Sequence, residues 1–182
     1  MSQVLIVEDD SIAAMQYKVA LEARKHKVRI TRDGEECLRA YSEALSASRS
    51  MDPELMTHPY DVVIIDFRIP KINGAQVAME ILSFNPRQKI VFATAYLSEL
   101  MNHFPDIARL GRYISILPKP FEYRLLIDEV ESRIIRDQLQ ALGVDVDALL
   151  AAGATHDKLV ALLEKIKALS DDDNKDNGSS LR

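Results

Sequence analysis

Five polar residues stand at or just after the ends of short apolar runs, and together they have the chemistry to move a phosphoryl group onto a carboxylate. They are Glu8, Asp9, Asp66, Thr94 and Lys119. Clustered acids hold Mg²⁺ through oxygen ligands, and the metal and a lysine together neutralise phosphoryl oxygens. A threonine hydroxyl can donate a hydrogen bond to one of those oxygens. Asp66 would be the nucleophile and would carry the product as an acyl phosphate.

The strands that position these groups are expected at five apolar segments rich in β-branched residues. Helical patterns separate the segments, and this alternation predicts a doubly wound α/β domain with a parallel sheet and right-handed crossovers. In such sheets ligands bind beyond the carboxyl ends of the strands, so the five polar residues would converge on one edge. The expected strands are Gln3–Val7, Lys27–Ile30, Val62–Ile65, Lys89–Ala93 and Ile114–Leu117.

Glu8, Asp9 and Asp10 are consecutive acids that repel one another, and such a cluster is usually offset by a cation or a helix N-terminus. Ser11 can cap the helix that follows. Capping by acids explains one of the three at most, so we interpret the cluster as a cation site. The apolar positions of that helix recur at helical spacing and are Ile12, Met15, Val19 and Ala23.

The connections before the third and fifth strands depart from simple helical patterns. A helix is expected over 35–45. Residues 46–59 read as an inserted loop, with one extra helical turn as an option, and a loop of this length is either functional or mobile. A second helix is expected over 98–111, where Pro105 removes a backbone donor and is expected to split it in two.

Lys119 is enclosed by Pro118 and Pro120, which gives it unusually rigid backbone support for a lysine. Because Pro118 cannot donate to a strand ladder, we expect the fifth strand at an edge of the sheet. The Lys119–Pro120 bond is a candidate for cis geometry, which would direct the ammonium inward over the sheet.

Composition limits the remaining function classes. The chain has 182 residues, of which 47% are hydrophobic, enough for a packed core, and no apolar run approaches the roughly 20 residues that cross a bilayer. With no signal-peptide pattern, we expect a cytoplasmic protein. The single Cys37 excludes an internal disulfide framework. Residues 1–121 carry 15 Lys and Arg against 15 Asp and Glu, so the net charge of -5 lies in the last 61 residues and disfavours nucleic acid as a partner.

Four ordered motifs give the chain a clear resemblance to the receiver domain of two-component response regulators, the CheY-like superfamily. They are VLIVEDD at the start, DVVIIDFRIPKING in the middle, FATA after the fourth strand and PKPF after the fifth. The resemblance covers about residues 2–135. It implies a flavodoxin-like fold with strand order 2-1-3-4-5. It also implies these roles: Asp66 as phosphoacceptor, Asp9 as direct Mg²⁺ ligand, Glu8 as ligand through water, the Arg68 backbone carbonyl as third protein ligand, Thr94 as switch hydroxyl and Lys119 as phosphate counter-ion. Asp10 has no role in this set and is expected to help cap the first helix.

The same resemblance implies a signalling phosphoacceptor that is loaded by a histidine kinase or phosphotransfer protein. We expect no enzyme activity beyond self-phosphorylation and self-dephosphorylation. One position departs from the family pattern: the aromatic residue usually found three residues before the lysine is Ile116 here, and the nearest aromatic is Tyr113.

The C-terminal third is expected to be helical and then disordered. We divide the chain into a receiver domain over 1–135, a helical extension over 136–169 and a disordered tail over 170–182. A long fifth helix is expected over 122–142, and a later helix carries one apolar face, which could fold back on the receiver, pack across a homodimer or meet a partner. One alternative function is a transcriptional regulator whose minimal C-terminal effector binds DNA. Another is a degenerate receiver that is never phosphorylated, against which the complete set of acids, threonine and lysine argues and for which Ile116 is the motive. The apolar face comprises Leu159, Leu162, Leu163, Ile166 and Leu169.

Overall fold

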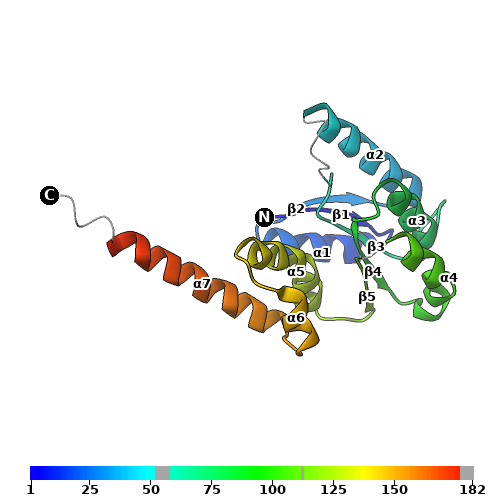
Figure 1. The fold of residues 1–182 in the computed structure, drawn as a ribbon. Coiled ribbons are helices and arrows are strands. Elements are labelled where there is room, and N and C mark those ends of the chain that lie inside the picture. The colour runs from blue at the N-terminus through cyan, green and yellow to red at the C-terminus, as the bar shows by residue number, and fades with distance from the viewer. Residues whose placement is uncertain (52–57, 112, 177–182) are drawn as a thin grey trace. The chain divides into compact units, whose positions relative to one another are not determined.

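The computed structural model describes the backbone of residues 1–51, 58–111 and 113–176, in which the chain forms two compact units. The first unit is Met1–Val130 and the second is Glu131–Arg182. Helix α5, Tyr123–Ala141, begins in the first and ends in the second (Figure 1). Among the described residues, no helix combines the length and the apolar character that crossing a membrane would require.

The first unit is built on a five-stranded parallel sheet in the order β2-β1-β3-β4-β5. This confirms the predicted fold class and strand order, and each strand lies within one residue of its expected bounds. The edge placement of β5 agrees with Pro118, and the Lys119–Pro120 peptide bond is cis. The strands are β1 (Gln3–Val7), β2 (Lys27–Thr31), β3 (Val62–Ile65), β4 (Lys89–Thr94) and β5 (Ile114–Pro118).

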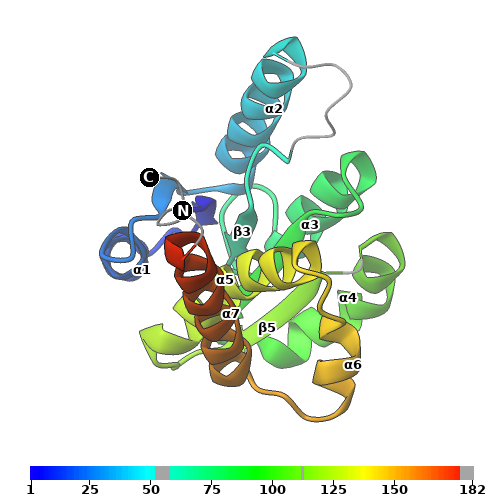
Figure 2. The ribbon, with the colours of Figure 1, turned by 60° about the vertical axis from the view of Figure 1, so that its left-hand side comes forward.

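Helices cover both faces of the sheet (Figures 1 and 2). The central strand β3 is buried along its whole length, and its side chains alternate between two cores. Val63 and Ile65 pack with α2, α3 and α4, whereas Val62 and Ile64 pack with α1 and α5. The helices of this unit besides α5 are α1 (Ser11–Glu22), α2 (Gly34–Met51), α3 (Gly74–Phe84) and α4 (Leu97–Leu110).

Helix α2 is longer than predicted and takes up the first residues of the expected loop over 46–59. The hydroxyls of Ser46 and Ser48 donate to the carbonyl oxygens of Ser42 and Ala44, each across 2.9 Å. The serines therefore bond along their own helix instead of ending it, and the helical part of this stretch, which ends at Met51, is longer than the single extra turn that the sequence left room for. Residues 52–57 lie outside the described part of the chain.

Helix α4 continues through Pro105, so the expected division into two helices is wrong. Pro105 is exposed, and the carbonyl oxygen that it leaves without a helical partner can bond to water instead. Leu100 and Ile107 are buried on either side of the proline and fix both halves of the helix against one core.

Asp10 caps the first helix, as expected for the acid that has no role at the cation site, whereas Ser11 is the first residue of the helix. The Asp10 carboxylate accepts from the backbone N–H groups of Ile12 and Ala13 at 2.8 and 3.2 Å. The predicted apolar spacing does not mark the buried face. Ile12, Met15 and Val19 are 69, 53 and 60% exposed, while the buried residues of α1 are Ala14, Tyr17 and Leu21.

The second unit contains the end of α5 with α6 (Val146–Ala151) and α7 (His156–Asp176). Its own small core covers the described part of the apolar face expected on the last helix, since Leu159 and Leu163 are buried there and Leu162 and Ile166 pack against it. The side chain of Leu169, the last residue of that face, lies outside the described part. The other buried members of this core are Ile135, Leu139 and Val146. Part of the expected disordered tail, residues 170–176, continues α7, and residues 177–182 lie outside the described part.

Candidate functional site

The carboxyl ends of β1, β3, β4 and β5 bring four of the predicted site residues to one edge of the sheet. Glu8 and Asp66 follow β1 and β3, which are paired in register, Thr94 ends β4 and Lys119 follows β5. The backbone N–H of Asp66 continues the ladder by donating to the carbonyl oxygen of Val7 across 3.0 Å. The site is therefore a product of strand alignment.

Lys119 joins two of the acids directly. Its Nζ lies 2.6 Å from Oε2 of Glu8 and 2.7 Å from Oδ2 of Asp66, close enough for two charge-assisted hydrogen bonds. Glu8 is only 2% exposed and Asp66 is also buried. One ammonium group therefore serves two carboxylates in a largely dry environment.

The electrostatics of this trio show an excess of negative charge. Burial raises the pKa of Glu8, and although Lys119 counteracts this effect, the pKa stays above its ordinary value. Burial alone would lower the pKa of Lys119, but the hydrogen bonds to Asp66 and Glu8 raise it further than burial lowers it. Lys119 is therefore firmly protonated, and a further cation would relieve the repulsion that remains between the acids.

Asp9 completes a set of three carboxylates that fits a small divalent cation. One ligand atom from each of Glu8, Asp9 and Asp66 lies within 4.8 Å of the other two. Oxygen ligands about 2.1 Å from one Mg²⁺ stand at most about 4.2 Å apart, so a slight contraction would bring these atoms to that spacing. The donor set, made only of carboxylate oxygens, is the type that Mg²⁺ prefers.

The loop after β3 holds Asp66 against the start of α3. A Cβ at Gly74 would stand 2.2 Å from the Asp66 carbonyl oxygen, so only glycine allows the helix to approach so closely. Asn73 caps α3 by accepting from the backbone N–H of Gln76, and Gly74 N–H donates to the Phe67 carbonyl oxygen across 2.8 Å. The loop between β3 and α3 therefore holds the backbone of Asp66 against the first turn of α3.

Thr94 is fully buried and bonded on two sides. Its hydroxyl oxygen accepts from the backbone N–H of Tyr96 at 3.1 Å, and its carbonyl oxygen accepts from the backbone N–H of Lys119 at 2.9 Å. Thr94 is thus bonded through its hydroxyl to the loop that begins α4 and through its backbone carbonyl to the lysine loop.

Sequence reasoning missed the side-chain contacts of Arg68. Its guanidinium makes two hydrogen bonds to Glu99, at 2.6 and 3.3 Å, and stacks 3.9 Å from the ring centroid of Tyr96. Its backbone N–H is 3.4 Å from Oδ1 of Asp66. Because the partners are distant in the chain, no local pattern pointed to this link between the acceptor loop and α4.

Sequence reasoning also missed Tyr17, which lies in the buried face of α1. The Lys119 ammonium sits over its ring, 5.9 Å from the centroid. Phe121 stacks on the same ring at 5.6 Å, with an interplanar angle of 23°. The apolar positions predicted to be the buried face of this helix lie on its exposed side, and Tyr17 is not among them.

Ile116, which stands where the family has an aromatic residue, is partly buried and packs against the core formed with α2, α3 and α4. Tyr113 is exposed. Neither residue provides a ring beside Thr94, whereas Tyr96 is joined to Thr94 by a hydrogen bond.

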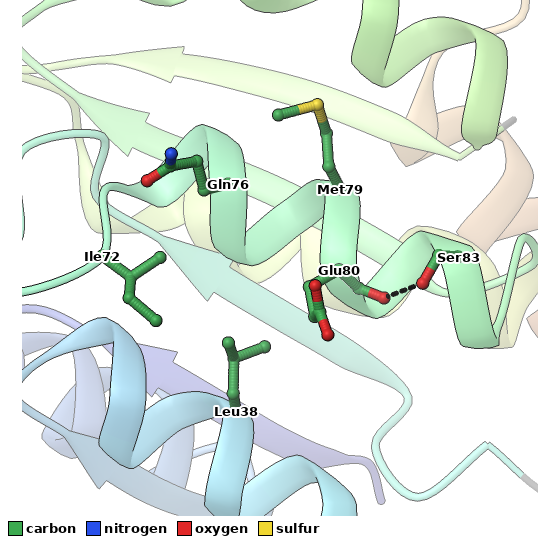
Figure 3. Close-up of a pocket in the computed structure, with 6 residues that line it drawn as sticks. All are labelled: Leu38, Ile72, Gln76, Met79, Glu80 and Ser83. Carbon is green, nitrogen blue, oxygen red and sulfur yellow. Dashed lines mark hydrogen bonds between the residues drawn. The ribbon is translucent and has the colours of Figure 1, made fainter.

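A groove of about 470 Å³ lies between α2 and α3 (Figure 3). Among the residues that the structure describes, Glu80 is its only charged lining residue, and the Glu80 carbonyl oxygen accepts from the Ser83 hydroxyl. The groove contains none of the predicted site residues. Its lining consists of Leu38, Ile72, Gln76, Met79, Glu80 and Ser83.

Comparison with known proteins identifies relatives of the first unit. Residues 4–131 match the family profile described as "Response regulator receiver domain". The chain is 25% identical over 135 residues to the response regulator receiver protein CpdR of Brucella abortus (strain 2308), covering 74% of this chain and 98% of CpdR. It is 27% identical over 150 residues to the response regulator ArlR of Staphylococcus aureus (strain Mu50), covering 82% of this chain and 59% of ArlR.

Solved structures agree on the fold. A crystal structure of a response regulator receiver domain protein from Clostridium thermocellum superposes with a TM-score of 0.59 at 22% identity. The superposition covers 77% of this chain and 99% of that chain.

Proposed function

This chain belongs to the response regulator receiver domain family, and from that membership we propose that Asp66 accepts a phosphoryl group from a histidine kinase or a histidine phosphotransfer protein in the cytoplasm. The observation that carries the proposal is the position of Lys119, hydrogen-bonded to both Glu8 and Asp66 at the carboxyl edge of the sheet. A cation in that place stabilises phosphoryl transfer, because the oxygens of the transferred group carry negative charge in the transition state.

In the proposed reaction an Asp66 carboxylate oxygen attacks the phosphorus of a phosphohistidine. The bond from phosphorus to the imidazole nitrogen breaks, its electron pair stays on the nitrogen, and an acyl phosphate forms on Asp66. Water attacking the phosphorus later releases inorganic phosphate and restores the carboxylate. No other enzyme activity is proposed.

Glu8, Asp9 and Asp66 would hold Mg²⁺, with the Arg68 backbone carbonyl as the further protein ligand. When bound, the ion neutralises part of the charge on the phosphoryl oxygens. Lys119 would exchange its bond to Asp66 Oδ2 for a phosphoryl oxygen. The Thr94 hydroxyl, which now accepts from the Tyr96 N–H, would rotate and donate to a second phosphoryl oxygen.

The exposed apolar side of α1 supports docking of a protein phosphodonor. Ile12, Met15 and Val19 form it, and the helix starts immediately after the acids. A partner that brings a phosphohistidine to Asp66 must bind beside those acids, and an uncovered apolar surface there fits a protein better than a small solute.

The experiment is incubation with Mg²⁺ and acetyl phosphate, followed by intact mass measurement. We expect one added phosphoryl group on the parent protein and none on Asp66→Asn. Asp61→Asn is the matched control, because Asp61 precedes the same strand and its carboxylate bonds the Gln3 N–H far from the site. An unlabelled parent protein, or labelled Asp66→Asn, would overturn the proposal.

We propose that the output acts through protein contacts or a phosphorylation-dependent homodimer rather than DNA. The second unit offers little to a phosphate backbone, since residues 131–182 carry ten Asp and Glu against seven Lys and Arg. A gel shift with salt variation tests the DNA-binding alternative, which requires a specific complex that weakens as salt rises.

A further inference from the structure

The ammonium of Lys119 is enclosed on two sides. On one side it bonds Glu8 and Asp66, and on the other it lies over the ring of Tyr17. A lysine side chain is flexible and must be ordered to hold one position, so both sides contribute to where the charge sits. The acids are the reacting groups, whereas Tyr17 belongs to α1.

Tyr17 is held rigidly in this place. It is 5% exposed, and the rings of Phe121 and Tyr123 pack on it at 5.6 and 6.1 Å. The Tyr123 hydroxyl donates to Oε1 of Gln16, the residue before Tyr17, across 2.7 Å. Residues 16 and 17 thus contact Phe121, two residues after Lys119, and Tyr123, the first residue of α5.

The chemistry of a ring suits this position better than an aliphatic side chain would. The face of an aromatic ring is electron-rich and attracts a cation within about 6 Å. The other buried residues of α1, Ala14 and Leu21, lack such a face. A partly buried ammonium that loses one of its carboxylate partners during the reaction would keep this attraction.

We propose that Tyr17 is a positioning residue for phosphoryl transfer: its ring holds the Lys119 ammonium where it can meet the phosphoryl oxygens on Asp66. This inference rests on the proposed function of Asp66. In this proposal Tyr17 contacts neither the carboxylates nor the phosphoryl group, and it acts only through Lys119.

The test compares phosphorylation rate constants with acetyl phosphate and Mg²⁺, under conditions where circular dichroism shows each variant folded. Because 5.9 Å is near the limit of a cation–ring contact, we expect Tyr17→Leu to be roughly 3- to 10-fold slower than the parent protein. Tyr17→Phe keeps the ring and should stay within about twofold of the parent rate. Leu21→Val, which removes volume from the same helix and core, should also stay within about twofold of the parent rate.

A double-mutant cycle separates positioning from general loosening of the core. In a Lys119→Met background, Tyr17→Leu should have no further effect on the rate. An equal slowing in both backgrounds, a Tyr17→Leu rate equal to the parent rate, or a Leu21→Val rate as low as that of Tyr17→Leu would each overturn the inference. A parent protein that accepts no phosphoryl group would instead refute the function of Asp66.

A spectroscopic reading covers the case in which Tyr17→Leu does not fold. The chain has no Trp and six Tyr, so its intrinsic emission comes from tyrosine. Phosphorylation should change this emission, and Tyr17→Phe should lose a clear share of the change. Tyr41→Phe should keep it, because Tyr41 bonds Gln88 away from the site. An unchanged response in Tyr17→Phe would contradict the inference.

Discussion

The backbone N–H of Lys119 donates a hydrogen bond to the carbonyl oxygen of Thr94 across 2.9 Å. It continues the pairing of β4 and β5 past Pro118, which has no N–H to donate. The two residues proposed to contact the same phosphoryl group are therefore fixed to each other by the backbone. A shift of the loop after β4 would therefore also move the backbone of Lys119.

Replacing Thr94 by valine should slow labelling of Asp66 and also destabilise the fold. The Tyr96 N–H would lose its acceptor, which we expect to lower the free energy of unfolding by about 1–2 kcal/mol. Loss of a donor to a charged oxygen should slow phosphorylation roughly tenfold or more. Urea unfolding and intact mass over time measure the two effects. Thr94→Ser keeps the hydroxyl and should label close to the parent rate; equal rates for Val and Ser would refute the role of the hydroxyl.

Magnesium should raise the melting temperature, because it binds the folded site and relieves repulsion among the carboxylates. Chelation by EDTA should reverse the shift. Asp9→Asn should remove most of it, whereas Asp10→Asn is the matched control: it deletes a charge from the same acidic run but leaves a residue that caps α1 equally well. A magnesium shift that survives in Asp9→Asn would place the ion elsewhere.

The exposed side of α1 should be needed for transfer from a protein but not from a small donor. Ile12→Ser with Met15→Ser should reduce phosphotransfer from a phosphorylated histidine phosphotransfer protein by tenfold or more, an order-of-magnitude expectation for lost interface anchors. Labelling by acetyl phosphate should not change. Phe84→Ser controls for surface polarity, since Phe84 is 61% exposed on α3. Equal losses with both donors would point to damage at Asp66 itself.

The single thiol should report on opening of the fold. Burial raises the pKa of Cys37 to about 12, from an ordinary value of 9.0. Between these values the folded protein keeps a proton that the unfolded chain has released, so stability falls as pH rises through this window and is unaffected below it. At neutral pH we expect labelling by iodoacetamide only through unfolding, and slower still with magnesium. Rapid labelling of the folded protein would contradict the burial of Cys37.

Substitutions in the core of the second unit should lower the stability of that unit without changing the rate at which Asp66 is phosphorylated. Leu163→Ala removes a buried side chain from its core and should cost about 2–4 kcal/mol, seen as loss of helix in thermal unfolding. Leu150→Ala, at a partly exposed position on α6, should cost much less. Both variants should label at the parent rate. Slower labelling of Leu163→Ala would show that the two units are coupled.

The sheet and the convergence of acids and lysine could be predicted because each depends on short local patterns. Val62–Ile65 reads as a strand buried on both faces, and a polar residue directly after such a strand must lie at the carboxyl edge. Glu8, Asp66 and Lys119 were therefore expected together, and they lie within hydrogen-bonding distance.

The features that could not be predicted from the sequence are those that depend on tertiary contacts. The face of α1 was misjudged because apolar residues also occur on its exposed side, and only packing shows that Tyr17 points inward. Pro105 was expected to break α4, but burial of Leu100 and Ile107 holds the helix together. The bonds between Arg68 and Glu99 join residues distant in the chain, which no periodicity can indicate.

Lys119 reaches Glu8 and Asp66 from the far end of the fold, since the lysine follows the last strand and the acids follow the first and the third. The two ion pairs therefore join segments that lie 111 and 53 residues apart in the chain. Truncating this one side chain would leave two buried carboxylates without their shared counter-charge, so the lysine should matter for the stability of the sheet edge as well as for the proposed chemistry.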